Sequence, residues 1–287
     1  MYEGVFSPIP DPGAYLARLG LEPDDYRKSL HPELPASPSE FSAPHEKAAL
    51  DTLVRAHLMT VPFEDLDIFE LGREVSLEIN DVYDKIVNRR RGGFCFELNG
   101  LFCSLLEALG FDCRPIAVRV LFEGEFPPMG HRSTIVTLPD GQRVTCDVGF
   151  GGPTPLGAVY LDCSEVQHSG RLDFRYEKRP GGLYRFIYIQ RDGSEMPLHL
   201  FSDAEFSKMD FVALSVYMSR GDHARFRNER VLNILRDCGS AAIQDDMLRL
   251  HDDGVLTEIE LKTPEERKAA YVKYFGMPEE SLAELPG

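Results

Sequence analysis

The sequence has little positive charge, no long apolar run and none of the common phosphate- or metal-binding motifs. Its 31 lysines and arginines face 47 aspartates and glutamates, which leaves a formal net charge of −16 at pH 7. An acidic surface repels nucleic acid and anionic membranes, so neither is expected as the main partner. No apolar stretch approaches the ~20 residues that a membrane-spanning helix needs. An anionic small molecule held by a local group of arginines remains compatible with this charge.

The sequence also lacks the common motifs of metal and nucleotide binding, which excludes several classes of site. HExxH, zinc-type cysteine spacing, GxGxxG and GxxxxGK(S/T) are all absent, so the sequence predicts no metal ion. The cysteines include no CxxC pair, and the first residues lack a basic segment followed by an apolar one. We therefore expect a cytoplasmic location and free thiols. The six cysteines are Cys95, Cys103, Cys113, Cys146, Cys163 and Cys238.

Hydrophobic periodicity divides the chain into three parts. A length of 287 residues is too long for one small core and indicates two or three subdomains. Residues 1–110 have a mainly helical pattern, with a proline- and serine-rich loop at 29–41. Residues 111–205 have the pattern of strands and hairpins, and residues 206–287 mix strands with helices. We expect an α+β fold.

The segment RGGFCFEL at 91–98 is the most informative in the chain. Two glycines precede Cys95, and we expect them to bend the backbone just before a helix begins. The apolar spacing from Phe94 to Leu109 predicts that helix. A thiol at a helix N-terminus lies beside free N–H groups, which favours the nucleophilic thiolate. Cys103, in the middle of the helix, is instead typical of a small apolar core residue.

A predicted hairpin supplies two partners for such a thiolate. A cysteine nucleophile needs a base within hydrogen-bond reach, and the base needs an acceptor that orients it. His131 leads into the first strand, and Asp147 lies near the end of the second, across a turn at 139–142. Pairing Leu138 with Arg143 brings His131 close to Asp147, although a slip of one residue changes which side chains share a face. Taken singly, each residue has a simpler structural explanation.

Several separated motifs resemble those of the arylamine N-acetyltransferases. RGGFCFELN at 91–99 resembles the nucleophile motif of that family, and DVGFGG at 147–152 resembles its aspartate motif. VPFEDLDI at 61–68 is similar to the family segment PFENLDI, and His131 lies between the cysteine and the aspartate in the family order. DFVALSVYMS at 210–219 resembles a diverged DFxxxNxYxS stretch. The similarity is concentrated between about 50 and 160.

The resemblance implies a fold and a reaction. Family members combine a helical bundle, a β-barrel-like domain and an α/β lid around a cysteine-protease-like core, here implied at 1–110, 111–205 and 206–287. They transfer an acetyl group from acetyl-CoA to arylamines or hydrazines through an acetyl-cysteine. The implied roles are nucleophile for Cys95, base for His131 and orienting acceptor for Asp147. The implied partners are a CoA thioester and a small amine.

Further roles are implied by the same resemblance. Arg91 and Glu64 would form a buried ion pair that shapes the loop under the cysteine, whereas an ordinary basic helix end is the alternative for Arg91. Contacts to CoA are implied for Pro127, Met129, Gly130 and Tyr217, and an aromatic acceptor pocket for Phe63, Phe94 and Phe150. A plain tight loop and core aromatic residues are the alternatives.

Some residues depart from the family pattern. Asp65 and Ser215 stand where asparagine is usual, and Arg220 and His223 replace small hydroxyl residues of the lid. Arg220 and Arg225 would instead contact CoA phosphates, or a carboxylate on the acyl group.

Other functions stay open on the sequence alone. A hydrolase or transpeptidase of the cysteine-protease type uses the same triad, although the cathepsin-type sequence around the cysteine is missing. An amide synthase or a malonyltransferase would use another acyl donor. A non-enzymatic module that binds aromatic amines would leave the triad unused. Xenobiotic arylamines, hydrazines and biosynthetic amines all fit as acceptors.

Overall fold

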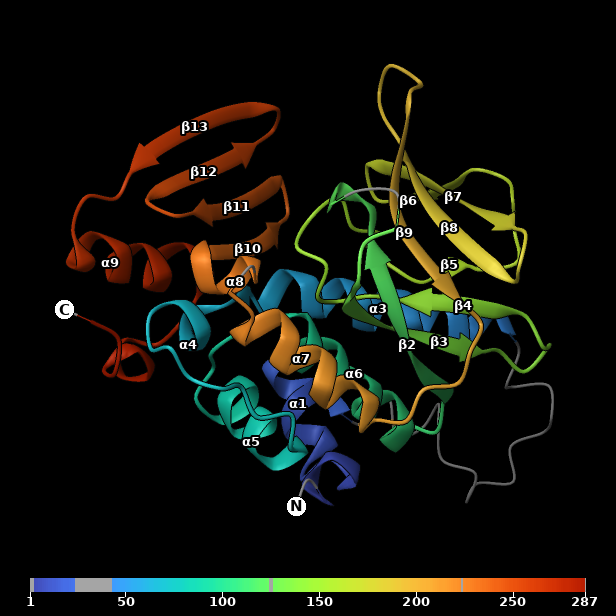
Figure 1. Cartoon of the computed structure of the whole chain (residues 1–287), viewed down its shortest axis with the longest axis horizontal. Coiled ribbons are helices and arrows are strands. Elements are labelled where there is room, and N and C mark those ends of the chain that lie inside the picture. The colour runs from blue at the N-terminus through green and yellow to red at the C-terminus, as the bar shows by residue number, and fades with distance from the viewer. Residues whose placement is uncertain (1–2, 24–42, 124–125, 223, 287) are drawn as a thin grey trace.

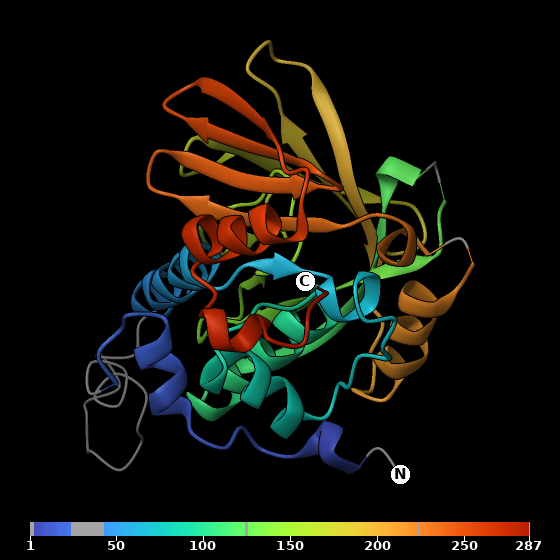
Figure 2. The ribbon, with the colours of Figure 1, turned by 90° about the vertical axis from the view of Figure 1, so that its left-hand side faces the viewer.

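The computed structural model describes residues 3–23, 43–123, 126–222 and 224–286. Two β-sheets lie side by side over a group of helices (Figures 1 and 2). This mixed arrangement confirms the expected α+β class. The expected loop at 29–41 and the departure at His223 lie outside the described residues.

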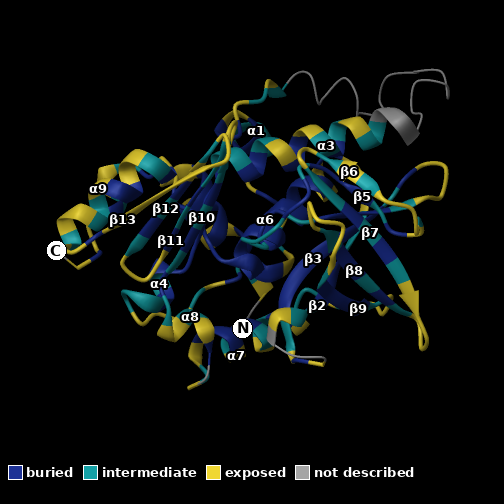
Figure 3. Ribbon diagram, turned by 90° about the horizontal axis from the view of Figure 1, so that it is seen from above, coloured by how far each residue is buried: buried dark blue, intermediate teal, exposed yellow. Residues whose placement is uncertain are grey.

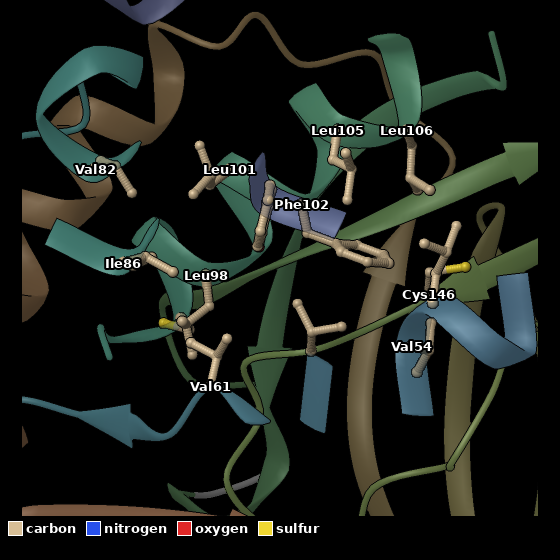
Figure 4. Close-up of a cluster of buried hydrophobic side chains, with 14 of the residues drawn as sticks. Val54, Val61, Val82, Ile86, Leu98, Leu101, Phe102, Leu105, Leu106 and Cys146 are labelled. Atoms are coloured by element: carbon tan, nitrogen blue, oxygen red, sulfur yellow. The ribbon is translucent and has the colours of Figure 1, made fainter. Parts of the chain in front are cut away.

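Helices make up most of the first part of the chain. They are η1 (Glu3–Phe6), α1 (Pro12–Arg18), α3 (Ala43–Thr60), α4 (Leu66–Phe69), α5 (Ile79–Tyr83), the π-helical turn η2 (Asp84–Asn88) and α6 (Cys95–Ala108). α6 is the central helix, because each of its residues from Cys95 to Leu106 is buried (Figure 3). Its apolar side chains pack against those of α3, α5 and η2, as the labelled residues of Figure 4 show. Packing on several faces holds the start of this helix in place.

An eight-stranded antiparallel sheet forms the middle of the chain. Its strands are β2 (Asp112–Val120), β3 (Met129–Thr137), β4 (Arg143–Cys146), β5 (Val159–Tyr160), β6 (Gln167–Ser169), β7 (Leu172–Arg179), β8 (Leu183–Ile189) and β9 (Glu195–Ser202), with η3 (Leu121–Glu123) after β2. Their spatial order is β5-β4-β3-β2-β9-β8-β7-β6. The side chain of Gln167 joins the two edges, because it exchanges two hydrogen bonds of 2.8 Å with the backbone of Tyr160. The sheet is therefore nearly closed and barrel-like.

The β3–β4 hairpin differs by one residue from the expected register. Thr137, and not Leu138, pairs with Arg143. The turn is shorter than expected: the backbone N–H of Leu138 donates to the carbonyl of Gln142 at 2.8 Å, and Gly141 adopts a left-handed φ of 82°. His131 and Asp147 are in contact in spite of this difference, because both lie beyond Thr134 and Cys146, where the pairing of β3 with β4 ends.

The last part of the chain forms most of a second sheet, three α-helices and a short 3-10 helix. The sheet has the order β1-β10-β11-β12-β13, in which β1 (Phe63–Glu64) comes from the helical part. The remaining elements are α7 (Asp210–Arg220), α8 (Arg225–Asn228), β10 (Val231–Arg236), β11 (Gly239–Gln244), β12 (Met247–Asp252), β13 (Val255–Glu260), α9 (Pro264–Phe275) and η4 (Glu279–Leu282). Phe211 and Met218 of α7 belong to the apolar cluster around α6. α7 thus packs against α6 and against strand β3 of the barrel-like sheet.

The turn before α6 is made by Arg90 and not by the two glycines. Arg90 has a left-handed φ of 55°, whereas neither glycine has a positive φ. A Cβ atom on Gly92 would lie 2.1 Å from the carbonyl oxygen of Pro62. Gly93 forms a parallel bridge with Phe63. Gly92 is therefore needed because the chain at the start of β1 approaches closely, and Gly93 because a Cβ atom there would lie 2.8 Å from the capping side chain of Glu97.

Candidate active site

Three side chains from separate elements meet at one cavity. Cys95 is the first residue of α6, His131 lies on β3, and Asp147 directly follows β4. Cys95 and His131 are each 2% exposed and both line a cavity of about 100 Å³. The Sγ atom of Cys95 lies 3.8 Å from the carbonyl oxygen of Gly130, the residue before His131. A buried thiol and a buried imidazole therefore face one small open space.

The imidazole is paired with the carboxylate. His131 Nε2 and Asp147 Oδ2 are 2.5 Å apart. Burial by itself lowers the pKa of His131, but Asp147 and Cys95, through charge and hydrogen bonding, raise that pKa to about 10. Burial raises the pKa of Asp147, and the charge and hydrogen bond of His131 outweigh it and lower the pKa to about 2. At neutral pH the pair is an imidazolium and a carboxylate beside the thiol.

Asn99 ties this pair to the helix that carries the thiol. It lies one turn after Cys95 on α6 and is completely buried. Its Nδ2 donates to Asp147 Oδ1 at 3.0 Å, and its Oδ1 accepts from the N–H of Val148 at 2.9 Å. The backbone N–H of Gly149 donates a second hydrogen bond to Asp147 Oδ1, also of 3.0 Å. Hydrogen bonds from Asn99 of α6 and from the loop at Gly149 hold the Asp147 carboxylate in position next to the imidazole of His131.

A second histidine lies behind the first. The ring of His199, on β9, is 5.3 Å from the ring of His131 and 4.2 Å from that of Phe150, between centroids. Burial, and then the charge of His131, lower the pKa of His199 to about 3. The ring is neutral and adds no charge next to the imidazolium. Donor atoms of His131, Asp147 and His199 lie within 4.8 Å of one another, but the first two already share a hydrogen bond that a metal ion would have to break.

A buried network of charges supports the start of α6. Arg91 and Glu64 form the expected ion pair, with Nη2 and Oε1 2.8 Å apart. Lys85 joins them: its Nζ lies 2.6 Å from Asp67 Oδ2 and 2.9 Å from Glu97 Oε1. Glu97 Oε2 accepts from the backbone N–H of Phe94 at 3.0 Å, which caps the helix next to the thiol. Burial raises the pKa of Glu97 to about 7.

Comparisons with known proteins identify the family of this chain. The N-acetyltransferase family model matches residues 48–281. An arylamine N-acetyltransferase of Mycobacterium tuberculosis is 33% identical over 218 residues, which cover 74% of this chain and 76% of the relative. The chain belongs to the arylamine N-acetyltransferase family. The Mycolicibacterium smegmatis enzyme is 29% identical over 284 residues, 96% of this chain and 94% of the relative. The Mycobacterium marinum enzyme in complex with CoA superposes with a TM-score of 0.81 at 26% identity, covering 96% of this chain and 95% of that one.

Family membership decides among the functions that the sequence left open. The chain is an acyltransferase, so the hydrolase and the non-enzymatic binding module are set aside. No helix among the described residues is long and apolar enough to cross a membrane.

Of the residues predicted to contact CoA or the acceptor, some line the cavity and others do not. Phe63, Phe150 and Gly130 line it, whereas Phe94 is buried beneath it and its ring contacts that of Phe226. Pro127 and Met129 are not among the lining residues; Pro128 lines it instead. Tyr217 is 54% exposed on α7, where its neighbour Met218 faces the cavity.

Sequence reasoning missed several residues of the site. Asn99, His199, Met218 and Phe226 were not singled out, although a lone amide four residues after Cys95 on an apolar helix is a signal that points to Asn99. Of the two arginines considered, Arg225 lines the cavity. Arg220 does not, and it lies 3.5 Å from Glu74 in an exposed ion pair.

Proposed function

We propose that this acyltransferase works in two steps through an acetyl group carried by Cys95. The observation that supports this most directly is the shared cavity of Cys95 and His131, with Asp147 2.5 Å from the imidazole. An imidazolium beside a cysteine stabilises the thiolate, which attacks a thioester without waiting for a proton to leave.

In the first step the Cys95 sulfur attacks the carbonyl carbon of acetyl-CoA. The carbonyl oxygen becomes an oxyanion, which the N–H groups at the start of α6 are placed to stabilise, an effect worth ~3 kcal/mol per donor. The bond to the CoA sulfur then breaks. The CoA thiolate leaves and takes the proton of His131, so the products are acetyl-Cys95 and CoA.

In the second step a neutral amine attacks the acetyl-cysteine. His131, now neutral, accepts a proton from the attacking nitrogen as the new amide bond forms. The bond to Cys95 sulfur breaks, and the thiolate–imidazolium pair is restored. Phe63, Phe150 and Phe226 give the cavity aromatic walls that suit arylamines and hydrazines.

For the acyl donor we propose contacts along Pro127, Met129 and Gly130, and a contact of Tyr217 with the distal end of CoA. A second surface is an alternative binding site for the distal end of CoA. A groove of about 480 Å³ shares Gly152 with the cavity and contains Arg55, Arg171, Arg191 and Arg236. Comparing Tyr217→Ala with Arg191→Ala separates the two routes, because only the variant on the true route raises the KM for acetyl-CoA.

Mass spectrometry of the intact protein after addition of acetyl-CoA tests the function. We expect one added acetyl group, located on Cys95 by peptide mapping and removed when an arylamine is added. Cys95→Ser should stay unlabelled, and its transfer rate should be lower than that of the wild type by more than about a hundredfold. Cys163→Ser, a thiol away from the cavity, is the matched control. An unlabelled wild-type protein that still transfers acetyl groups would refute the intermediate.

A donor with a carboxylate, such as malonyl-CoA, is the second candidate, and Arg225 is the observation that favours it. Its side chain lines the cavity, and its Nε lies 2.9 Å from Glu229 Oε2, which leaves the terminal N–H groups for a carboxylate. Acetyl-, propionyl- and malonyl-CoA are compared with one neutral arylamine. If malonyl-CoA is a donor, Arg225→Gln should lower its kcat/KM by about tenfold or more and leave that of acetyl-CoA unchanged. Arg227→Gln, whose side chain does not line the cavity, is the control.

A further inference from the structure

Arg132, the neighbour of His131 on β3, is buried without an evident counter-ion. Its side chain is 3% exposed, and its Nε and Nη2 atoms have no hydrogen-bond partner among the residues that the structure describes. The guanidinium lies over the ring of Phe211, 4.5 Å from the centroid. A buried cation with unused donors is costly unless an anion lies close to it. Burial lowers the pKa of Arg132, and the negative charges of Cys103 and Glu107 oppose that effect.

Two thiols beside Arg132 can supply that anion. The Sγ atoms of Cys103 on α6 and Cys113 on β2 are 3.9 Å apart. The hydrogen bond from Cys113, and then the charge of Arg132, lower the pKa of Cys103 to about 7, although burial opposes them. The same hydrogen bond raises the pKa of Cys113. Cys103 is thus the sulfur of the pair that more readily becomes the thiolate, and the carboxylate of Glu107 lies within 4.8 Å of both sulfurs.

We propose that Cys103 and Cys113 form a redox-sensitive dithiol, whose thiolate is the counter-ion of Arg132 and which hydroperoxides convert to a disulfide. Cys103 is buried, but Cys113 is partly exposed and gives a small oxidant access to the pair. The sulfurs must approach by roughly 2 Å to reach bonding distance, which a side-chain rotation can supply. The cavity of the proposed function is a separate place, and the dithiol does not depend on it.

The chemistry balances with hydrogen peroxide as the oxidant. The thiolate attacks one peroxide oxygen, the O–O bond breaks, and a sulfenic acid and hydroxide form. The second thiol then attacks the sulfenic sulfur, the S–O bond breaks, and water leaves as the disulfide forms. The two thiols lose two electrons in total, and the peroxide gains them. A dithiol reductant such as dithiothreitol reverses the change.

Oxidation removes the negative charge beside Arg132. The backbone of Arg132 is joined to the site, because its carbonyl oxygen accepts from Asn99 Nδ2 at 2.6 Å. The same amide holds Asp147. If the Arg132 guanidinium moves after the negative charge is lost, the backbone of Arg132 and its hydrogen bond with Asn99 shift as well. We therefore expect the disulfide to lower the rate of acyl transfer. This effect on activity rests on the proposed function, whereas the disulfide itself does not.

Peptide mapping of Cys95→Ser protein tests the site without interference from the candidate nucleophile. Trypsin leaves both cysteines on one peptide, 92–119, because no lysine or arginine lies between them and the Arg114–Pro115 bond resists cleavage. After limiting hydrogen peroxide this peptide should lose two hydrogens and resist alkylation, and dithiothreitol should restore it. Exposed Cys238 should oxidise more slowly and is the internal reference. Faster oxidation of Cys238, or a sulfinic acid without the disulfide, would overturn the proposal.

Two further variants test the roles of Arg132 and of the partner thiol. Arg132→Met should slow the oxidation and Arg132→Lys should retain it, because the charge and not the shape stabilises the thiolate. For the link to catalysis, wild type and Cys113→Ser are treated with peroxide and compared at equal modification of Cys95. Wild type should lose activity that dithiothreitol restores, beyond the loss in Cys113→Ser. Equal losses would overturn the link to catalysis.

Discussion

Asn99, which lies one helical turn after Cys95 on α6, donates a hydrogen bond of 3.0 Å to Asp147. One side chain thereby connects the element that carries the thiol with the loop that carries the carboxylate. Its oxygen also accepts from Val148, so the loop after β4 is held at two points. The distance between Cys95 and Asp147 is consequently set by the rigid geometry of a helix and a single amide.

Replacing Asn99 by alanine should lower both stability and activity. The N–H of Val148 would lose a buried acceptor, which costs about 1–3 kcal/mol of unfolding free energy. Asp147 would lose one of its supports, and we expect kcat to fall by between about tenfold and a hundredfold. Urea unfolding and steady-state kinetics measure the two effects. Asn88→Ala, which removes an exposed amide–carboxylate bond of the same 3.0 Å length to Asp84, should change neither.

Asp147→Asn should reduce kcat by roughly a thousandfold or more, because the amide no longer stabilises the imidazolium or fixes its tautomer. Circular dichroism should show an intact fold. The chain offers a matched control: His168 and Asp173 form a pair with the same 2.5 Å separation at the surface. Asp173→Asn should keep the wild-type rate. Similar rates in the two variants would contradict the orienting role of Asp147.

His131 should titrate near pH 10 in the folded protein, because its pKa is raised to about 10 from an ordinary value of about 6.5. Since the raised pKa favours the protonated form, this group stabilises the fold fully below pH ~6.5 and loses that contribution as the pH rises through about 10. The NMR shift of the His131 ring protons, assigned with His131→Gln, measures the titration. Asp147→Asn should lower the midpoint. A wild-type midpoint near the ordinary value would contradict an imidazolium at rest.

Arg91→Met should destabilise the protein by about 3–5 kcal/mol, because it leaves Glu64, which is completely buried, without its closest cation. Urea unfolding measures the loss. Arg89→Met removes an exposed pair with Asp84 at 3.4 Å and should cost less than about 1 kcal/mol. If both variants cost the same, the buried network does not support the start of α6.

Local patterns predicted part of the secondary structure, but they did not single out the strands β7, β10 and β11. The helix after Cys95, the β3–β4 hairpin and the α+β class all follow from periodicity and turn residues. The register of β3 and β4 was wrong by one residue, because one extra paired residue at Gln142 shortens the turn and local patterns do not distinguish the two turn lengths. The bend before α6 was assigned to glycine and belongs to Arg90.

Partners that are distant in sequence were beyond local patterns. Lys85 is a buried lysine because Glu64, Asp67 and Glu97 surround it, and those residues come from β1, α4 and α6. His199 reaches the back of His131 only because β2 pairs with β3 on one side and with β9 on the other. Cys103 has the spacing of a core residue, and only the packing of α6 on β2 brings Cys113 next to it.

The sequence by itself determined which chemical groups are present, where the helices and strands begin, and that a thiol stands at a helix N-terminus. These properties depend on residues within a few positions of one another, so local patterns carry them. The tertiary structure alone decided how the imidazole and carboxylate are protonated, which second histidine lies behind them, and which arginine reaches the cavity. Those properties depend on burial and on distances between elements, because desolvation and Coulomb energy act through space and not along the chain.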